Sequence, residues 1–216
     1  DGVLEAVTRV YPEEAQTPAG FATGITLRPY QRQSLAFMLN VERRTGNELP
    51  PLGAKGTRGG WLCDEVGMGK TAVVVATCLA HPATVKRGSD AQWSQMVRAI
   101  MWTPAPKYRA EETGWTRCPD WQGPRMQLKA TLVLTNVSLV GQWEDEFKKF
   151  APGLRVQRFY GSDKFTRRGL GDWRDVDVLI STFTTPFLTR GRFERTLLDG
   201  AQFHRLVIDE CHLASK

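Results

Sequence analysis

The chain has 216 residues, of which 41% are hydrophobic and 24% are charged, and its formal net charge is +6. This length and composition suit one domain with a hydrophobic core, and they exclude a peptide, a disordered tail and a large multidomain assembly. Because the sequence has no apolar run of about 18 residues and its start lacks the pattern of a signal peptide, we expect an intracellular protein with no membrane partner.

The positive charge is unevenly distributed along the chain. Residues 81–130 carry 8 basic and 4 acidic side chains, and residues 151–205 carry 10 basic and 6 acidic ones. Such blocks suit a polyanionic partner. On charge alone, a basic surface that only faces solvent accounts for them equally well.

Short runs rich in branched or aromatic residues alternate with segments of helical spacing. The predicted strands are 59–65, 130–134, 154–160, 177–182 and 204–210. The predicted helices are 29–44, 70–80 and 138–150, each followed by Gly, Pro or His near its end. This alternation indicates an α/β fold with a mainly parallel central sheet and helices on both faces.

The stretch 81–129 interrupts the alternation, because it is far longer than the loops that usually join strands and helices. It holds four of the seven tryptophans, Trp93, Trp102, Trp115 and Trp121, and a short helix is predicted over 91–102. We interpret it as an insertion. It is either a small surface subdomain whose tryptophans pack on the main body, which we favour, or a surface that binds a protein partner or stacks on bases.

A glycine-rich turn stands between the first predicted strand and its helix. Gly67 and Gly69 allow a tight backbone turn, Lys70 supplies a positive charge for phosphates, and the Thr71 hydroxyl is a hard ligand for Mg²⁺. The pattern GxxxxGK[ST] requires Gly where Asp64 stands, so the textual match is incomplete. The turn nevertheless predicts a triphosphate site, because a strand precedes it and a helix follows.

The last predicted strand ends in a pair of carboxylates, about 140 residues after Lys70 in an alternating α/β chain. The carboxyl ends of parallel strands face the same crevice as the first loop between strand and helix. We therefore expect Asp209 to hold Mg²⁺ and Glu210 to orient or deprotonate the attacking water.

Five blocks of sequence occur in an order that resembles a known family. They are LRPYQ at 27–31, GGWLCDEVGMGKT at 59–71, the segment 131–143, DVLIST at 177–182 and DECH at 209–212. Together they are similar to the first RecA-like lobe of Swi/Snf-type ATPases of helicase superfamily two, in which the phosphate loop commonly begins with Asp. The long insertion resembles the branch that contains post-replication repair translocases. Thr135 and Asn136 depart from the family, which usually has Cys-Pro or a similar pair there.

The resemblance implies roles for further residues. Gln31 would recognise the adenine edge through its amide, and Arg28 and Met68 would complete the ATP-binding set. Three residues lie in segments that meet the phosphate backbone of double-stranded DNA in the family, namely Ser138, Gln142 and Thr182. Trp143 lies beside them, but its spacing from Leu139 and Phe147 favours a place in the core.

The resemblance also implies a domain layout. Residues 1–26 would be an N-terminal extension, and residues 27–216 a RecA-like ATP-binding lobe with the insertion at 81–129. We expect a second lobe in a longer parent chain, and with it the arginine finger that stabilises the transition state. The isolated lobe would then bind ATP and Mg²⁺ but hydrolyse ATP poorly.

Two alternatives stay open. One is a strand-separating DExH helicase, against which the Gln142-Trp143 block favours the Swi/Snf type. The other is a non-catalytic DNA-binding or interaction module with a vestigial nucleotide site. In such a module, DNA or another partner would be bound by basic residues, namely Arg155, Arg158, Arg167, Arg168, Arg190, Arg192 and Arg195.

Overall fold

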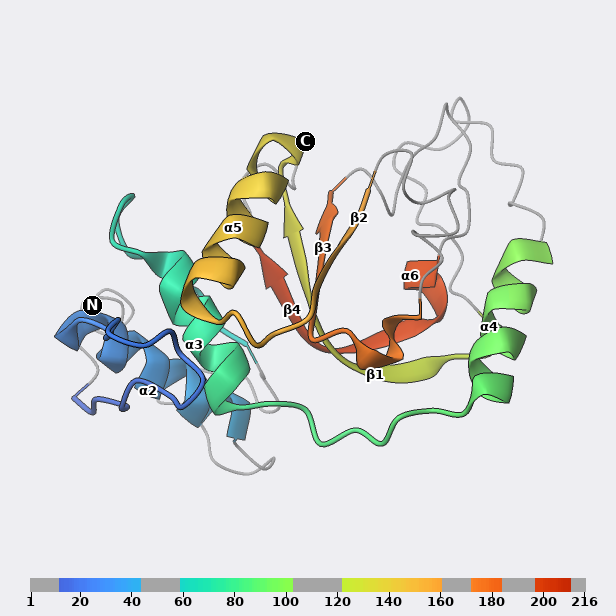
Figure 1. The fold of residues 1–216 in the computed structure, drawn as a ribbon, viewed down its shortest axis with the longest axis horizontal. Coiled ribbons are helices and arrows are strands. Elements are labelled where there is room, and N and C mark those ends of the chain that lie inside the picture. Colours follow the sequence, from blue (N-terminus) through green and yellow to red (C-terminus); the bar gives the residue numbers. More distant parts are fainter. Residues whose placement is uncertain (1–11, 44–58, 103–121, 161–171, 184–196, 211–216) are drawn as a thin grey trace, which may run out of the picture. The chain divides into compact units, whose positions relative to one another are not determined.

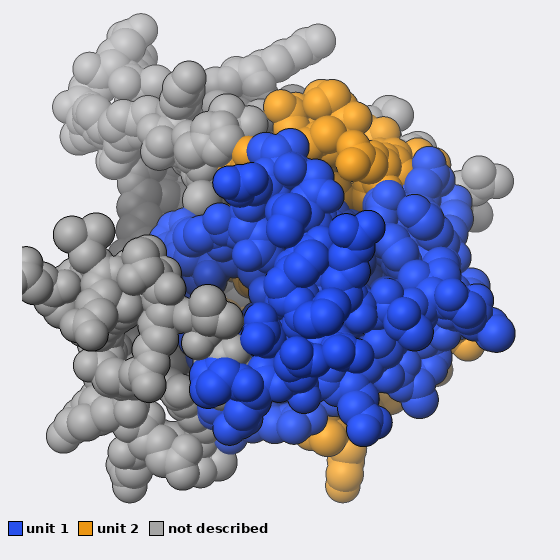
Figure 2. All heavy atoms as spheres, turned by 90° about the vertical axis from the view of Figure 1, so that its left-hand side faces the viewer, with its two compact units in different colours: residues 1–82, 145–153 blue, residues 83–144, 154–216 orange. Residues whose placement is uncertain are grey.

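A computed structural model of the chain describes residues 12–43, 59–102, 122–160, 172–183 and 197–210. The chain divides into two compact units, shown in different colours in Figure 2. Unit 1 comprises residues 1–82 and 145–153, and unit 2 comprises residues 83–144 and 154–216.

Unit 2 contains a four-stranded parallel sheet (Figure 1). Its strands are β1 (Met126–Thr135), β2 (Val156–Phe159), β3 (Val178–Thr182) and β4 (Ala201–Ile208). They lie in the order β2-β3-β1-β4, and all three pairings are parallel. Parallel pairing requires long crossovers between strands, so the alternating pattern of the sequence predicted the fold class correctly.

The two central strands, β3 and β1, each pair with a strand on both sides. All five residues of β3 are buried, and β3 pairs with β1 from Thr131↔Val178 to Thr135↔Thr182. A continuous run of apolar residues is typical of such strands. β1 begins four residues earlier than predicted, because its first residues pair with the start of β4 from Met126↔Ala201 onward.

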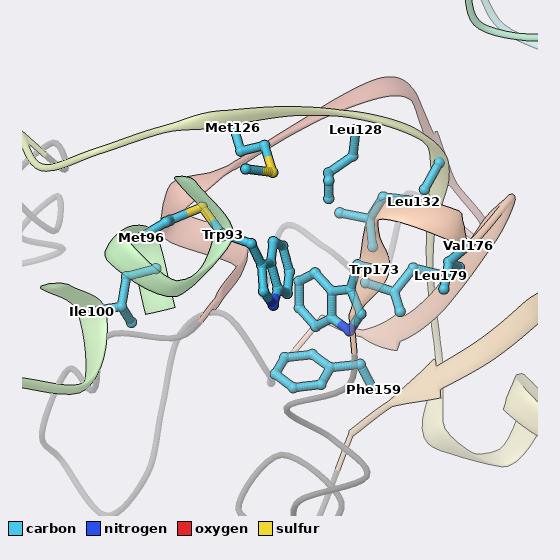
Figure 3. Close-up of a cluster of buried hydrophobic side chains, with 11 residues drawn as sticks. Trp93, Met96, Ile100, Met126, Leu128, Leu132, Phe159, Trp173, Val176 and Leu179 are labelled. Atoms are coloured by element: carbon cyan, nitrogen blue, oxygen red, sulfur yellow. The ribbon is translucent and has the colours of Figure 1, made fainter. Parts of the chain in front are cut away.

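A cluster of aromatic and aliphatic side chains forms the core of unit 2 (Figure 3). Trp93, Met96 and Ile100 project from one face of α4 (Asp90–Trp102), at the spacing of an amphipathic helix. Trp173 lies between Trp93 and Phe159 in Figure 3, and its ring meets that of Phe159 edge to face, with centroids 4.8 Å apart. The burial of Trp93 agrees with the interpretation that tryptophans of the insertion pack on the main body. Residues 103–121 of the insertion, with Trp115 and Trp121, lie outside the described residues.

A buried arginine lies at the edge of this cluster. The Arg174 side chain is only 5% exposed; it bonds Asp172 through two nitrogens, pairs with Asp90 at 2.7 Å and donates to the Gly88 carbonyl at 2.9 Å. The hydrogen bond from Arg174 holds the pKa of Asp172 below its usual value, and the pKa of Asp90 is lowered for the same reason. The charge of the buried guanidinium is therefore matched by carboxylates from two segments of the chain.

Unit 1 is built on the helices α2 (Pro29–Arg43) and α3 (Lys70–Ala80). Leu35 and Leu39 of α2 pack with Val73 and Ala76 of α3, and all four side chains are buried. The predicted helices 29–44 and 70–80 are thus confirmed, the first to within one residue. Of the helices among the described residues, none is long and apolar enough to cross a membrane.

The predicted strand at 59–65 was wrong, because these residues are irregular in the structure. A strand requires a partner for its backbone hydrogen bonds, and the described part of unit 1 contains no strand to provide one. The composition of GGWLCDE suits a strand, but composition alone does not supply the partner.

The remaining elements are short helices and one longer one. The described chain also forms η1 (Val137–Leu139), α5 (Val140–Phe150), η3 (Trp173–Asp175) and α6 (Leu197–Gly200). Together η1 and α5 cover the helix predicted over 138–150. Strand β4 ends at Ile208, so Asp209 and Glu210 lie in the turn that follows it.

Candidate functional site

The glycine-rich turn of unit 1 has the backbone that a phosphate loop needs. Gly67 has φ 86° and Gly69 has φ 77°, both in the left-handed region that favours glycine. Gly69 is also the N-cap of α3, and no side chain caps the helix there. The first backbone N–H groups of a helix have no partner within the helix. The turn therefore presents free donors at the positive end of α3.

Lys70 is folded back across this turn. Its Nζ donates to the carbonyl oxygen of Asp64 at 2.8 Å and to that of Glu65 at 3.1 Å. A lysine at the first position of a helix opposes the helix dipole, and the first turn of α3 contains no acidic residue that would offset it. An anion bound at the turn would offset both the charge of Lys70 and the positive end of the helix dipole.

Helix α2 holds the turn through Met68. The Met68 carbonyl accepts a hydrogen bond from Gln31 Nε2 at 3.0 Å and one from the Tyr30 hydroxyl at 3.2 Å. Gln31 Oε1 in turn accepts from the Arg28 backbone N–H at 2.9 Å. The predicted nucleotide residues Arg28, Gln31 and Met68 are thus brought together by the structure. The Gln31 amide keeps a second donor and a second lone pair, because each of its two groups can make two hydrogen bonds.

One buried polar atom beside the turn lacks a partner. Asp64 Oδ2 is buried and makes no hydrogen bond within the described part of the chain. Such atoms are rare in folded proteins, because burying a polar atom without a hydrogen bond costs free energy. The carboxylate stands at the position where the phosphate-loop pattern requires glycine.

Three hydrogen bonds hold Asp209, which lies in the turn after β4. Its backbone N–H donates to the Leu134 carbonyl at 2.9 Å. Its Oδ2 atom accepts from the Thr135 hydroxyl at 2.9 Å and from Trp143 Nε1 at 2.7 Å. Trp143 is 5% exposed, so its prediction as a buried residue is confirmed, but the sequence did not reveal that its N–H meets the carboxylate.

Glu210 has an unusual backbone. Its φ of 48° makes it the one described residue other than glycine with a positive φ. For a residue with a side chain this conformation costs about 1–2 kcal/mol, and such costs are concentrated at functional sites. The strained backbone belongs to the residue that is predicted from the sequence to orient or deprotonate the attacking water.

The predicted DNA-contact residues differ in exposure. Ser138 and Gln142 are exposed, at η1 and at the start of α5, whereas Thr182 at the end of β3 is 5% exposed. Of the seven arginines named for the alternative, the structure describes two. Arg155 is exposed, and Arg158 pairs with Glu144 at 3.2 Å.

The residues predicted to bind nucleotide belong to both units: Lys70 and Thr71 to unit 1, and Asp209 and Glu210 to unit 2. Two contacts were not predicted from the sequence, namely the hydrogen bonds from Tyr30 to Met68 and from Thr135 to Asp209. Tyr30 adjoins Gln31, and Thr135 ends the strand beside the one that leads to Asp209, so only the strand pairing could have identified the second.

Comparison with known proteins identifies the family. The sequence matches the family described as the SNF2-related domain over residues 30–215. Because this match covers most of the chain, the chain belongs to the family of SNF2-related domains.

Several characterised proteins are similar to this chain. Transcription termination factor 2 of Drosophila melanogaster is 27% identical over 205 residues, which cover 92% of this chain and 17% of that protein. The DNA repair protein RAD5 of Cryptococcus neoformans is 30% identical over 180 residues, which cover 72% of this chain and 15% of RAD5. The helicase SWR1 of Candida albicans is 26% identical over 192 residues, covering 87% of this chain and 8% of SWR1. The chain thus spans less than a fifth of each relative.

A solved structure supports the fold. The SWI2/SNF2 ATPase core domain of Sulfolobus solfataricus aligns with a TM-score of 0.52 at 22% identity, covering 89% of this chain and 26% of that one. At this identity the likeness shows the fold alone. It agrees with the prediction of an α/β lobe with a parallel sheet.

Proposed function

We propose that this chain is the ATP-binding lobe of a DNA-dependent ATPase that translocates on double-stranded DNA. The observation that carries the proposal is the turn before α3, where Lys70 Nζ lies 2.8 Å from the Asp64 carbonyl oxygen and two glycines adopt left-handed conformations. An uncapped helix start with a lysine and no offsetting acid suits a polyphosphate.

The residues present fit Mg²⁺-ATP. Gly67, Gly69, Lys70 and the first turn of α3 would hold the triphosphate, and Gln31 would read the adenine through its remaining donor and lone pair. Thr71 and Asp209 would hold Mg²⁺, because hydroxyl and carboxylate oxygens are its preferred ligands. Asp209 Oδ1 has no hydrogen bond to any described residue, so one carboxylate oxygen is available.

Glu210 would take the proton of the attacking water. Bound Mg²⁺-ATP supplies the phosphoryl group that is transferred and part of the charge neutralisation. The chain's own contribution is to orient the phosphates and the water and to accept the proton. An arginine finger raises the rate about 10³–10⁵-fold, and in our proposal it belongs to a second lobe. We therefore expect the chain by itself to bind nucleotide and to hydrolyse it poorly.

Double-stranded DNA is the proposed polymer. Ser138 and Gln142 are exposed, in η1 and in the first turn of α5, where hydroxyl and amide groups can bond phosphate oxygens without reading sequence. We place the work of the protein in DNA repair or chromatin remodelling, and the name of one relative, the DNA repair protein RAD5, supports the first of these. Such work would place the protein inside the cell, and in the nucleus in a eukaryote.

We propose two further partners, namely the second lobe of the same parent chain and a protein bound at the insertion 81–129. RAD5, at 30% identity, supports the repair branch that the long insertion suggested.

Titration with a fluorescent ATP analogue in the presence of Mg²⁺ tests the nucleotide clause. We expect saturable binding that Lys70→Ala weakens at least tenfold, since removal of a charged partner of phosphate costs about 1.5–3 kcal/mol. Lys86→Ala is the matched control, because Lys86 is an exposed lysine outside the turn. Undetectable binding, or binding equally strong in Lys70→Ala, would contradict the proposal. DNA binding indifferent to both ATP and Lys70→Ala would favour the non-catalytic module instead.

A further inference from the structure

The Asp209 carboxylate is asymmetric in its contacts. Oδ2 accepts two hydrogen bonds, from the Thr135 hydroxyl at 2.9 Å and from Trp143 Nε1 at 2.7 Å. Two donors fill the two lone pairs of a carboxylate oxygen. Oδ1 makes no hydrogen bond to any residue in the described part of the chain. One oxygen is thus fully engaged by protein donors, and the other faces none of them.

Both donors are held rigidly by the fold. Thr135 ends β1 with 0% of its surface exposed, and Trp143 in α5 is 5% exposed. The Asp209 backbone is tied to the same strand, because its N–H donates to the Leu134 carbonyl at 2.9 Å. A carboxylate fixed by its backbone and by one oxygen has lost the rotation that would exchange its two oxygens.

We propose that Thr135 and Trp143 are positioning residues that occupy Oδ2 of Asp209 and leave Oδ1 as the single oxygen directed to Mg²⁺ or its bound water. This inference rests on the proposed function, in which Asp209 is a metal ligand. Neither residue touches the metal or the nucleotide in this arrangement. Each acts through the carboxylate, by fixing which oxygen is free and where it points.

Burial alone does not account for the contact of Trp143. Trp173 is 0% exposed in the same unit, yet its Nε1 has no hydrogen-bond partner among the described residues. The core of this unit therefore accommodates an indole whose N–H is unused. Trp173→Phe is then a matched control for Trp143→Phe, since both substitutions reduce a buried indole to a smaller ring and only one removes a donor from Asp209.

The first experiment measures the Mg²⁺ concentration needed for half-maximal binding of a fluorescent ATP analogue. Loss of a group that orients a metal ligand typically weakens metal affinity 10–100-fold. We expect Trp143→Phe and Thr135→Val each to raise the required Mg²⁺ about tenfold or more, and Thr135→Ser, which keeps the hydroxyl, to stay near wild type. Trp173→Phe should leave the requirement unchanged.

The second experiment needs no nucleotide and no metal. In a ¹H–¹⁵N spectrum of the full 216-residue chain, the indole signal of Trp143 is assigned by its disappearance in Trp143→Phe. We expect Asp209→Asn to move this signal, since the strong hydrogen bond to a charged oxygen becomes a weaker neutral one. The signals of other tryptophans should stay in place. A Trp143 signal unmoved by Asp209→Asn would overturn the contact.

The outcomes separate this inference from the proposed function. If the wild type binds Mg²⁺-nucleotide and Trp143→Phe and Thr135→Val need no more Mg²⁺ than it does, the positioning role is overturned and the proposed function stands. If Trp173→Phe raises the Mg²⁺ requirement equally, packing is responsible and the inference is again overturned. If the wild type binds no nucleotide, the proposed function fails and the metal clause of the inference fails with it, whereas the Trp143 signal still decides the contact with Asp209.

Discussion

Gln31 Nε2 lies 2.5 Å from the position that a Cβ atom on Gly69 would occupy. The same atom donates to the Met68 carbonyl at 3.0 Å, so the Gln31 amide is seated against the backbone of the turn. Only glycine permits this approach, because any side chain at residue 69 would displace the amide. Gln31, which is predicted to recognise adenine, therefore packs directly against the turn that is predicted to bind phosphate.

This approach predicts a difference between two glycine variants. A Cβ on Gly67, at φ 86°, meets nothing within 4 Å, whereas a Cβ on Gly69, at φ 77°, meets Gln31. We expect Gly67→Ala to lower the free energy of unfolding by about 1–2 kcal/mol, the cost of a left-handed conformation. Gly69→Ala should cost more, because the clash adds to the same backbone strain. Urea denaturation of both variants measures the difference, and equal costs would contradict the contact.

The hydrogen bonds to Met68 predict unequal effects of their donors. Gln31 is 8% exposed and makes two hydrogen bonds, while the Tyr30 hydroxyl makes one in an exposed setting. We expect Gln31→Ala to lower the free energy of unfolding by about 1–3 kcal/mol and Tyr30→Phe to lower it by less than about 0.5 kcal/mol. If Gln31 also reads adenine, its loss should narrow the preference for ATP over GTP. A preference unchanged in Gln31→Ala would limit this residue to a structural role.

The left-handed backbone of Glu210 predicts that glycine is tolerated better than alanine at this position. With φ at 48°, Glu210→Gly should be more stable than Glu210→Ala by about 1 kcal/mol, because only glycine adopts this region without cost. Glu210→Gln keeps the shape of the side chain but not its basicity. It should retain nucleotide binding and abolish DNA-stimulated hydrolysis in a longer chain that contains the proposed second lobe. Thermal unfolding and a phosphate-release assay provide the measurements.

The carboxylates around Arg174 predict a loss of stability in acid. Hydrogen bonding to Arg174 holds the pKa of Asp172 below its usual value. A lowered pKa stabilises the fold above the unfolded value of about 4, and this stabilisation is lost as the pH falls through the folded value. Urea unfolding at pH 7, 4 and 3 should show a steeper decline for wild type than for Asp172→Asn. Asp145→Asn, which removes an exposed carboxylate elsewhere, should decline as the wild type does.

Much of this fold follows from local sequence patterns. Helix α3 begins at Lys70 and ends at Ala80 as predicted, because glycine precedes it and His-Pro follows. The strands β2 and β3 also lie where short branched or aromatic runs predicted them. Local patterns were sufficient because each of these elements is bounded by residues that stop a helix or strand.

Features that depend on distant partners were not predictable in this way. The segment 59–65 has the composition of a strand, but a strand forms only where another strand pairs with it. The bond from Thr135 to Asp209 joins residues 74 positions apart and follows from the pairing of β1 with β4. Trp143 shows a similar limit: its spacing predicted burial, but not the acceptor that its N–H would meet.

Hydrogen exchange at the turn before α3 tests the central claim, nucleotide binding at Lys70, most directly. Peptides that span residues 64–73 are followed with and without Mg²⁺-ATP, in the wild type, in Lys70→Ala and in the Lys86→Ala control. We expect nucleotide to slow exchange in these peptides in the wild type and in Lys86→Ala, and we expect Lys70→Ala to abolish the effect. Unchanged exchange at the turn, or slowing that persists in Lys70→Ala, would contradict this claim.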